Sequence, residues 1–166
     1  MKNRHLRSLT LGGMIAALYV CLTYLSSVFG LASGAVQVRI SEALCVLPYF
    51  TAAAVPGLAV GCLVANLLFA TPLDVVFGTL ATLMGAVCTR LLRKVSPYLA
   101  PVPPILANMV IIPFVIAYSG GIPLEPLPLL FTAGTVGLGE VISCAVIGLP
   151  LLFVLMRHRI RLFGRE

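Results

Sequence analysis

Charge is what this sequence has least of. Among its 166 residues, 10% are Asp, Glu, Lys or Arg and 60% are hydrophobic, whereas soluble globular domains have roughly 25% and about 45 to 50%, respectively. The chain has too little polar surface to face water on all sides, which excludes an ordinary soluble fold. We expect an all-α membrane protein in which residues 1–166 form one integral-membrane domain, long enough for about six helices of roughly 20 residues.

Signatures of catalysis and of cofactor binding are missing as well. The sequence has no GxxxxGK[ST] motif, and neither of its lysines, Lys2 and Lys94, follows a glycine, so the chain cannot bind ATP by a P-loop. It has no HExxH motif, and both histidines lie in basic tails. The five cysteines lie in apolar runs and form no CxxC pair, which argues against a disulfide framework or a zinc site. We expect no enzyme activity, no resident cofactor and no metal.

The positive charges fall into three clusters, each beside an apolar stretch. They are Lys2, Arg4 and Arg7; Arg90, Arg93 and Lys94; and Arg157, Arg159, Arg161 and Arg165. Short cytoplasmic segments of membrane proteins carry such an excess of Lys and Arg. The net charge of +6 therefore needs no nucleic-acid partner to explain it.

If all three clusters are cytoplasmic, the number of crossings between them is constrained. Apolar stretches long enough to span a membrane cover residues 8–29, 74–90, 98–118 and 128–156. The stretch 43–72 must then cross an even number of times, either as two short helices that turn at the Pro-Gly pair of residues 55–58 or as a re-entrant loop. Two short helices fit best, which predicts a six-transmembrane-helix bundle with cytoplasmic N and C termini.

Glu140 is the most informative polar residue of these spans. It precedes Arg157 by 17 residues, so a continuous helix places it roughly 25 Å from the inner basic edge, in the outer half of a hydrocarbon core about 30 Å thick. A carboxylate at that depth costs about 2.5 to 3.5 kcal/mol and needs a partner or a water-filled cavity. A ligand or proton site explains Glu140 better than a purely structural, hydrogen-bonded carboxyl group.

Two amides accompany this carboxylate. Asn108 reaches a similar depth by the same arithmetic, and Asn66 lies in the outer part of the predicted third helix. A single intramembrane amide often serves only to join helices. Two amides that converge with a carboxylate can instead hydrogen-bond the edge of a heterocycle that offers both donors and acceptors.

Arg39 and Glu42 stand three positions apart before the second predicted helix. As an exposed ion pair they would contribute only about 0.2 to 1 kcal/mol. With Asp74 at the mouth of the fourth helix, they would form an outward-facing group of charges that captures, orients or gates a polar solute. We favour this second interpretation.

Helix 1 carries two interleaved pairs of small residues four positions apart, Gly12 with Ala16 and Gly13 with Ala17. Such a face lets another helix approach closely. The partner is either a helix of the same bundle or a second protein.

Two elements of the chain are distinctive, R-x-S-E-A-L at residues 39–44 and D-x-x-x-G-T-L-A-T-L at residues 74–83. With ILANMVIIPFV (105–115) and GLGEVISCAVIGLPLL (137–152), they make nearly the whole chain resemble the QueT family. Members of this family are six-helix substrate-binding S components of energy-coupling factor (ECF) transporters.

The resemblance implies a multi-pass importer subunit in the bacterial cell membrane. Such proteins capture a queuosine precursor or salvage base from outside, a 7-deazaguanine such as queuine or 7-aminomethyl-7-deazaguanine. They dock on a scaffold membrane protein that carries two cytoplasmic ATPases, so ATP is used by the partners and not by this chain. The small residues Gly12, Gly13, Ala16 and Ala17 resemble the surface that meets the scaffold.

Under this resemblance the polar residues acquire specific roles. Glu140 would accept the paired N–H groups of a guanine-like edge, while Asn108 would donate to its carbonyl. Glu42 or Asp74 would neutralise an aminomethyl group. Aromatic residues that would stack on the ring are Tyr49, Phe77 and Phe131.

Three alternatives remain open, one of which is a non-transporting assembly or structural membrane protein. Related bundles bind chemically different cargo, so the chain fits an S component for another vitamin. It also fits a stand-alone proton-coupled carrier of small solutes, with Glu140 as the proton relay.

Overall fold

The computed structural model describes residues 2–31 and 36–158, and this part of the chain consists of helices and their connections. The all-α prediction is confirmed. The elements are α1 (Lys2–Val28), η1 (Ile40–Tyr49), α2 (Ala54–Phe69), η2 (Asp74–Gly78), α3 (Thr79–Leu92), η3 (Pro97–Leu99), α4 (Val102–Tyr118), α5 (Pro126–Glu140), η4 (Val141–Ile147) and α6 (Gly148–Arg157). Of these, η1 and η3 are 3-10 helices, and η2 and η4 are π-helical.

Four helices are long and apolar enough to cross a membrane. They are His5–Val28, Asp74–Leu92, Pro97–Tyr118 and Pro126–Arg157, and in the last of these α5, η4 and α6 are continuous. They correspond to the four long stretches predicted from the sequence. Many bulky apolar side chains on these helices are exposed, among them Leu9, Val110 and Leu127, as expected for a surface that faces lipid.

The two helices between the first and second long spans are shorter. The 10 residues of η1 extend about 20 Å in 3-10 form, and the 16 residues of α2 extend about 24 Å. Neither reaches the thickness of a hydrocarbon core, about 30 Å. Residues 41–48 of η1 are all buried, so this segment lies inside the protein and not against lipid.

The turn predicted at residues 55–58 is wrong. The chain turns between η1 and α2, at residues 50–53, and Pro56 and Gly57 lie in the first turn of α2. Proline is tolerated there because the first N–H groups of a helix have no intrahelical acceptor.

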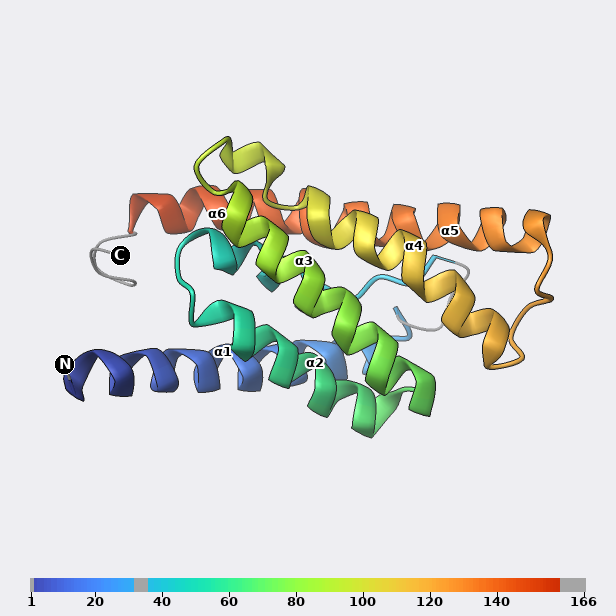
Figure 1. The fold of residues 1–166 in the computed structure, drawn as a ribbon, viewed down its shortest axis with the longest axis horizontal. Coiled ribbons are helices and arrows are strands. Elements are labelled where there is room, and N and C mark those ends of the chain that lie inside the picture. Colours follow the sequence, from blue (N-terminus) through green and yellow to red (C-terminus); the bar gives the residue numbers. More distant parts are fainter. Residues whose placement is uncertain (1, 32–35, 159–166) are drawn as a thin grey trace.

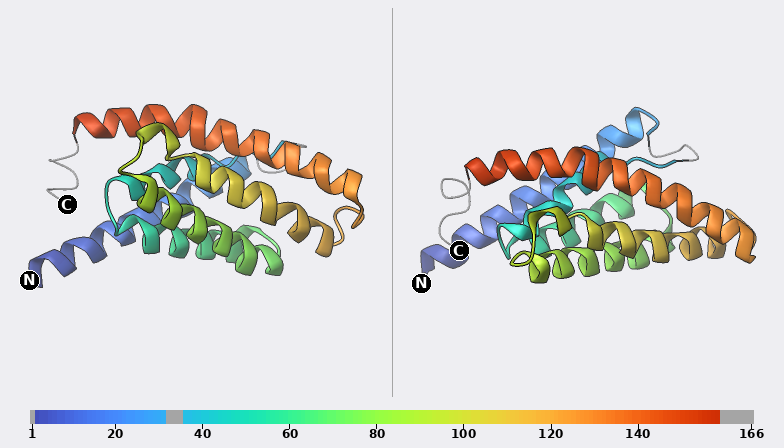
Figure 2. Two further views of the ribbon diagram at one scale, coloured as in Figure 1. Left: turned by 45° about the horizontal axis from the view of Figure 1, so that its top comes forward. Right: turned by 90° about the horizontal axis from the view of Figure 1, so that it is seen from above.

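Figure 1 shows α1 along one side of the bundle and the continuous helix of α5, η4 and α6 along the other, with α2, α3 and α4 between them. Figure 2 shows that α1 runs obliquely to the long C-terminal helix. η1 packs against α1, α3, η4 and α6. This central position of η1 carries its side chains into the middle of the bundle.

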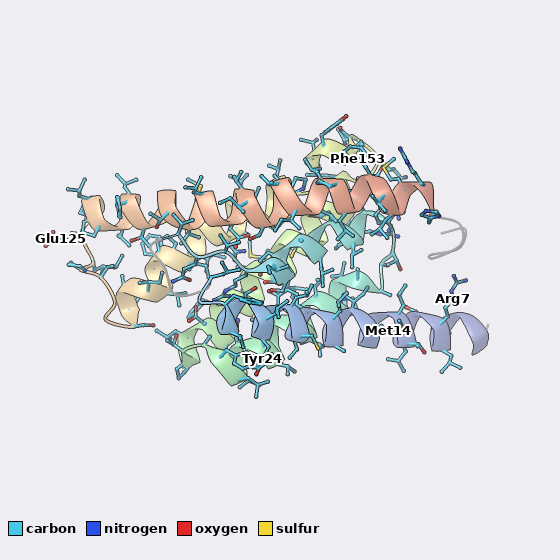
Figure 3. All side chains as sticks on the ribbon, turned by 180° about the vertical axis from the view of Figure 1, so that it is seen from behind. Arg7, Met14, Tyr24, Glu125 and Phe153 are labelled. Carbon is cyan, nitrogen blue, oxygen red and sulfur yellow. The ribbon has the colours of Figure 1, made fainter. Side chains whose placement is uncertain are left out.

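The start of α1, the α3–α4 connection and the end of α6 lie toward one end of the bundle (Figure 1). Arg7 of α1 and Glu125, which precedes α5, lie at opposite ends (Figure 3). The described parts of the three basic clusters thus share one end, the arrangement that the positive-inside rule requires. Arg159, Arg161 and Arg165 lie outside the described residues.

Small residues allow α1 and α2 to approach closely. A Cβ on Gly57 would lie 2.7 Å from the carbonyl oxygen of Gly12. A Cβ on Gly61 would lie 3.0 Å from Cα of Ala16. Any larger residue at these two positions of α2 would therefore push the helices apart.

The four residues predicted to dock a partner are divided by this packing. Gly12 and Ala16 face α2 within the bundle, whereas Gly13 and Ala17 are exposed. The docking role of all four residues stays a prediction, and Gly13 and Ala17 are the two whose surface is free.

Gly57→Ala tests the close packing of α1 on α2. The added methyl group meets backbone atoms of Gly12, which cannot move aside as the end of a side chain can, so we expect a loss of about 1 to 3 kcal/mol of unfolding free energy. Circular dichroism during thermal unfolding in detergent measures the change. Gly13→Ala is the matched control, because no atom lies within 4 Å of a Cβ at that position. Equal melting temperatures for the two variants would contradict the packing.

Candidate functional site

A small polar cavity lies inside the bundle, where the segment before η1 meets η1, α4, α5 and the continuous helix of η2 and α3. The residues that line it are Gln37, Arg39, Glu42, Gly78, Thr82, Asn108, Ile112, Val136 and Glu140. The cavity has a volume of about 20 Å³, which is room for about one water molecule.

Three helices each contribute two lining residues spaced four positions apart. Residues with this spacing share one face of a helix. The pairs are Gly78 with Thr82, Asn108 with Ile112, and Val136 with Glu140. The cavity is therefore built from one continuous face of each helix.

Glu140 has 9% of its surface exposed, and both of its carboxylate oxygens have partners. The side-chain amide of Asn108 donates to Oε1 over 3.0 Å. The thiol of Cys144, one helical turn further on, lies 3.3 Å from Oε2. The predicted approach of Glu140 and Asn108 is thus present, and the role of this pair in binding stays a prediction.

Glu42 is buried more deeply, with 2% of its surface exposed. The hydroxyl of Tyr19 donates to its Oε1, and the thiol of Cys45 lies 3.0 Å from Oε2. The thiol of Cys144 also lies 3.3 Å from the backbone carbonyl oxygen of Glu42. The sulfur atom of Cys144 therefore contacts both residues, Glu140 through its carboxylate and Glu42 through its backbone carbonyl.

Polar groups of α1 hold η1 in place. Thr23 donates to the hydroxyl of Ser41 over 2.8 Å, and the backbone N–H of Ile40 donates to the hydroxyl of Ser26 over 2.9 Å. Together with Tyr19, these residues of α1 form a buried polar face at the three- and four-residue spacing of a helix. This face fixes the register of η1 and with it the position of Glu42.

Gly139 allows the segment before η1 to lie on α5. A Cβ at Gly139 would overlap the carbonyl oxygen of Gln37. The missing side chain brings residues 37–39 against the helix turn that carries Glu140. Gln37 and Arg39 reach the cavity by this contact.

The cavity combines two carboxyl groups with one guanidinium group, those of Glu42, Glu140 and Arg39. Because Glu42 is buried, the interpretation of Arg39 and Glu42 as an exposed surface pair is wrong. The lining also offers the amide of Asn108 and the hydroxyl of Thr82. Such a set can hydrogen-bond a planar ring that presents donors and acceptors along its edge.

Two other predicted polar residues lie away from the cavity. Asn66 is buried, and its amide donates to the backbone carbonyl of Asp74 over 2.9 Å, behind Gly78. The carboxylate of Asp74 accepts from the N–H and the hydroxyl of Thr71 over 3.3 and 2.8 Å. The expected convergence of both amides on Glu140 is therefore wrong for Asn66, which stabilises the start of η2.

The three predicted stacking residues do not line the cavity either. Phe131 precedes Glu140 by nine residues, or two and a half helical turns, which places it on the opposite side of the helix. It is 71% exposed. Phe77 is half exposed and lines an apolar groove with Leu73 and Phe114. Tyr49 packs edge-on against Phe50, with ring centroids 5.2 Å apart.

Sequence reasoning missed several residues of the site. Cys144 follows the recognised Glu140 by four residues, so helical spacing from a polar residue was a usable signal for it, whereas Thr82 shares its helix face with a glycine that carried no such signal. Tyr19 belongs to the polar face of α1, which a helical projection of residues 19–26 displays. Nothing local to Gln37 or Cys45 indicates that they lie beside a carboxylate of another element.

Comparisons with known proteins assign the chain to a family. The family model described as QueT transporter matches residues 9–157. A protein of Lactococcus lactis subsp. cremoris (strain MG1363), named queuosine precursor transporter QueT, is 35% identical over 71 residues. That alignment covers 43% of this chain and 42% of the relative, so it spans less than half of either protein. No solved structure matches the chain.

The family model covers nearly all of the sequence, including every residue that lines the cavity. The chain therefore belongs to the QueT transporter family, a family of membrane transporters and not of enzymes.

Proposed function

We propose that this chain is the substrate-binding S component of an ECF importer in the bacterial cell membrane. It captures a queuosine precursor or salvage base with a 7-deazaguanine ring from outside and delivers it together with an ATPase-scaffold module. The observation that carries the proposal is the pair of Glu140 and Asn108, joined over 3.0 Å at the wall of a buried polar cavity. The name of the Lactococcus relative supports the cargo class.

The chemistry of the pair suits a guanine-like edge. Adjacent N–H groups of such a ring would replace the partners of Glu140 as donors to its carboxylate, while the Asn108 amide turns to donate to the ring carbonyl. An aminomethyl substituent would add a cation, which Glu42 at the same cavity neutralises. The positive charge of Arg39, which lines the same cavity, offsets part of the repulsion between the two buried carboxylates.

Binding requires the cavity to widen. Small-molecule sites have volumes of about 300 to 1,000 Å³, whereas this cavity has about 20 Å³. Both acids of the cavity already have donors within the protein, Asn108 for Glu140 and Tyr19 for Glu42, and the small volume makes the described form a closed one. Separation of residues 37–42 from α4 and α5 enlarges the space without breaking a long helix.

The proposed orientation puts the N and C termini in the cytoplasm. The described parts of the basic clusters share one end of the bundle, and Glu125 lies at the other end. The scaffold protein and its two ATPases would approach the exposed Gly13 and Ala17 on α1. ATP is then hydrolysed by the partners, in keeping with the missing P-loop motif.

Glu140→Gln tests the assignment of the cargo-binding acid. The amide offers one acceptor oxygen in place of two and turns an N–H donor toward the N–H groups of the ring. We therefore expect queuine to bind about 10- to 150-fold more weakly, which corresponds to the free energy of one hydrogen bond to a charged group. Calorimetry on the purified protein measures the change. Glu125→Gln, at an exposed acid far from the cavity, is the matched control. Unchanged affinity in a folded Glu140→Gln protein would remove Glu140 from the site.

A thermal-shift panel tests the cargo class. We expect queuine and 7-aminomethyl-7-deazaguanine to stabilise the purified protein, by about 2.7 kcal/mol when the ligand is present at 100 times its Kd. Guanine and common vitamins serve as comparisons. A strong response to a vitamin alone would favour an S component for other cargo, and no response to any deazaguanine would contradict the proposal.

Uptake by proteoliposomes distinguishes an S component from a stand-alone carrier. Vesicles that hold this chain alone should accumulate no cargo, with or without a proton gradient, because an S component depends on its ATPase partners. Vesicles that also hold the scaffold and both ATPases should accumulate it when ATP is supplied. Gradient-driven uptake by the chain alone would establish the alternative, in which Glu140 relays protons.

A further inference from the structure

A second cluster of reactive groups lies beside the cavity. Cys45 of η1 and Cys144 of η4 are fully buried, and neither lines the cavity. Their thiols nevertheless contact the two carboxylates that do line it, over 3.0 and 3.3 Å, and interact with each other. Two acids and two thiols thus meet at one point of the bundle.

The two carboxylates are held in the same way. In each, Oε1 accepts a hydrogen bond from a donor outside the cluster, Tyr19 for Glu42 and Asn108 for Glu140. In each, Oε2 is turned inward to a thiol. Metal-binding side chains are oriented by such outer hydrogen bonds, which leave one atom directed at the ion.

Three of the four side chains, those of Glu42, Glu140 and Cys144, place ligand atoms near the spacing of a tetrahedral zinc site. With Zn–S bonds of about 2.3 Å and Zn–O bonds of about 2.1 Å, sulfur and oxygen ligands lie about 3.6 Å apart. One ligand atom from each of Glu42, Glu140 and Cys144 falls within 4.8 Å of the others, and the fourth, Cys45, adjoins Glu42. Small side-chain rotations would bring all four around one ion.

We propose that Glu42, Glu140, Cys45 and Cys144 form a binding site for Zn²⁺ at the floor of the cavity. Thiolate ligands favour zinc over the hard cations Mg²⁺ and Ca²⁺, which take oxygen ligands. The site goes beyond the proposed transport function, since it needs no cargo. Because it shares Glu42 and Glu140 with the cavity, Zn²⁺ and cargo would compete for these carboxylates.

Charge and proton balance are consistent with this assignment. On binding, each thiol transfers its proton to solvent, and four bonds form from two sulfur and two oxygen atoms to the metal. Two carboxylates and two thiolates carry four negative charges, of which Zn²⁺ and Arg39 at the cavity wall offset three, and the hydrogen bonds from Tyr19 and Asn108 to the carboxylates would stabilise the remaining one. The ion would enter through the cavity in the widened form that cargo binding also requires.

Spectroscopy of the full-length, tag-free protein in detergent tests the site without cargo. We expect one equivalent of Co²⁺ to bind with the absorption of a tetrahedral site and a sulfur-to-metal charge-transfer band, and Zn²⁺ to displace it. X-ray absorption at the zinc edge should find two sulfur neighbours at about 2.3 Å in the wild-type protein. This second measurement needs no variant and so does not depend on any substitution being tolerated.

Cysteine variants locate the ligands. Cys144→Ser and Cys45→Ser should each weaken Zn²⁺ binding by more than the roughly 10- to 100-fold that loss of an orienting partner costs, and each should reduce the charge-transfer band. Cys21→Ser and Cys88→Ser remove exposed thiols and are the matched controls. Absence of sulfur neighbours in the zinc spectrum, or binding that depends on Cys21 or Cys88, would overturn the proposal. Failure of cargo binding in the panel above would leave these results unaffected, so the two proposals fail separately.

Discussion

The structure depends on the burial of two carboxyl groups in an otherwise apolar bundle. Removing an ionised carboxylate from water costs several kcal/mol unless charge or hydrogen bonds compensate. The carboxylate of Glu42 accepts from the hydroxyl of Tyr19 and the thiol of Cys45. The carboxylate of Glu140 accepts from the amide of Asn108 and the thiol of Cys144. These partners come from α1, η1, α4 and η4, so their contacts join those elements to α5 at the centre of the bundle.

The short η1 helix makes this meeting possible. Glu42 and Glu140 are 98 positions apart in the sequence. A helix that faces lipid can direct only one of its sides toward the centre of the bundle, whereas residues 41–48 of η1 are buried on all sides. η1 is enclosed by protein, where irregular backbone is tolerated at membrane depth because its polar groups find partners other than lipid. Its 3-10 geometry and its polar contacts with Thr23 and Ser26 turn Glu42 toward the long C-terminal helix.

The same two acids then face two environments. On one side is a small cavity with the amide and guanidinium donors of Asn108 and Arg39, suited to a planar heterocycle. On the other side are the thiols of Cys45 and Cys144, suited to a soft metal ion. An η4 segment in π-helical form begins directly after Glu140, and π-helical turns are frequent at functional sites. Polar and reactive side chains are thus concentrated at one place inside a bundle whose outer surface is apolar.

The sequence by itself determined the class of fold, the four long spans and the burial of Glu140, because composition, helix length and the cost of a buried charge are local or additive properties. It also indicated Asn108 as a neighbour, since depth along a helix follows from counting residues. Only the tertiary structure decided that η1 is an interior 3-10 helix, that the turn precedes Pro56, and that Tyr19, Cys45 and Cys144 surround the two acids. Those outcomes depend on how the helices rotate about their axes and cross. Contacts between distant segments, such as Gly12 with Gly57 and Gln37 with Gly139, set this rotation, and no local sequence pattern says which segments will meet.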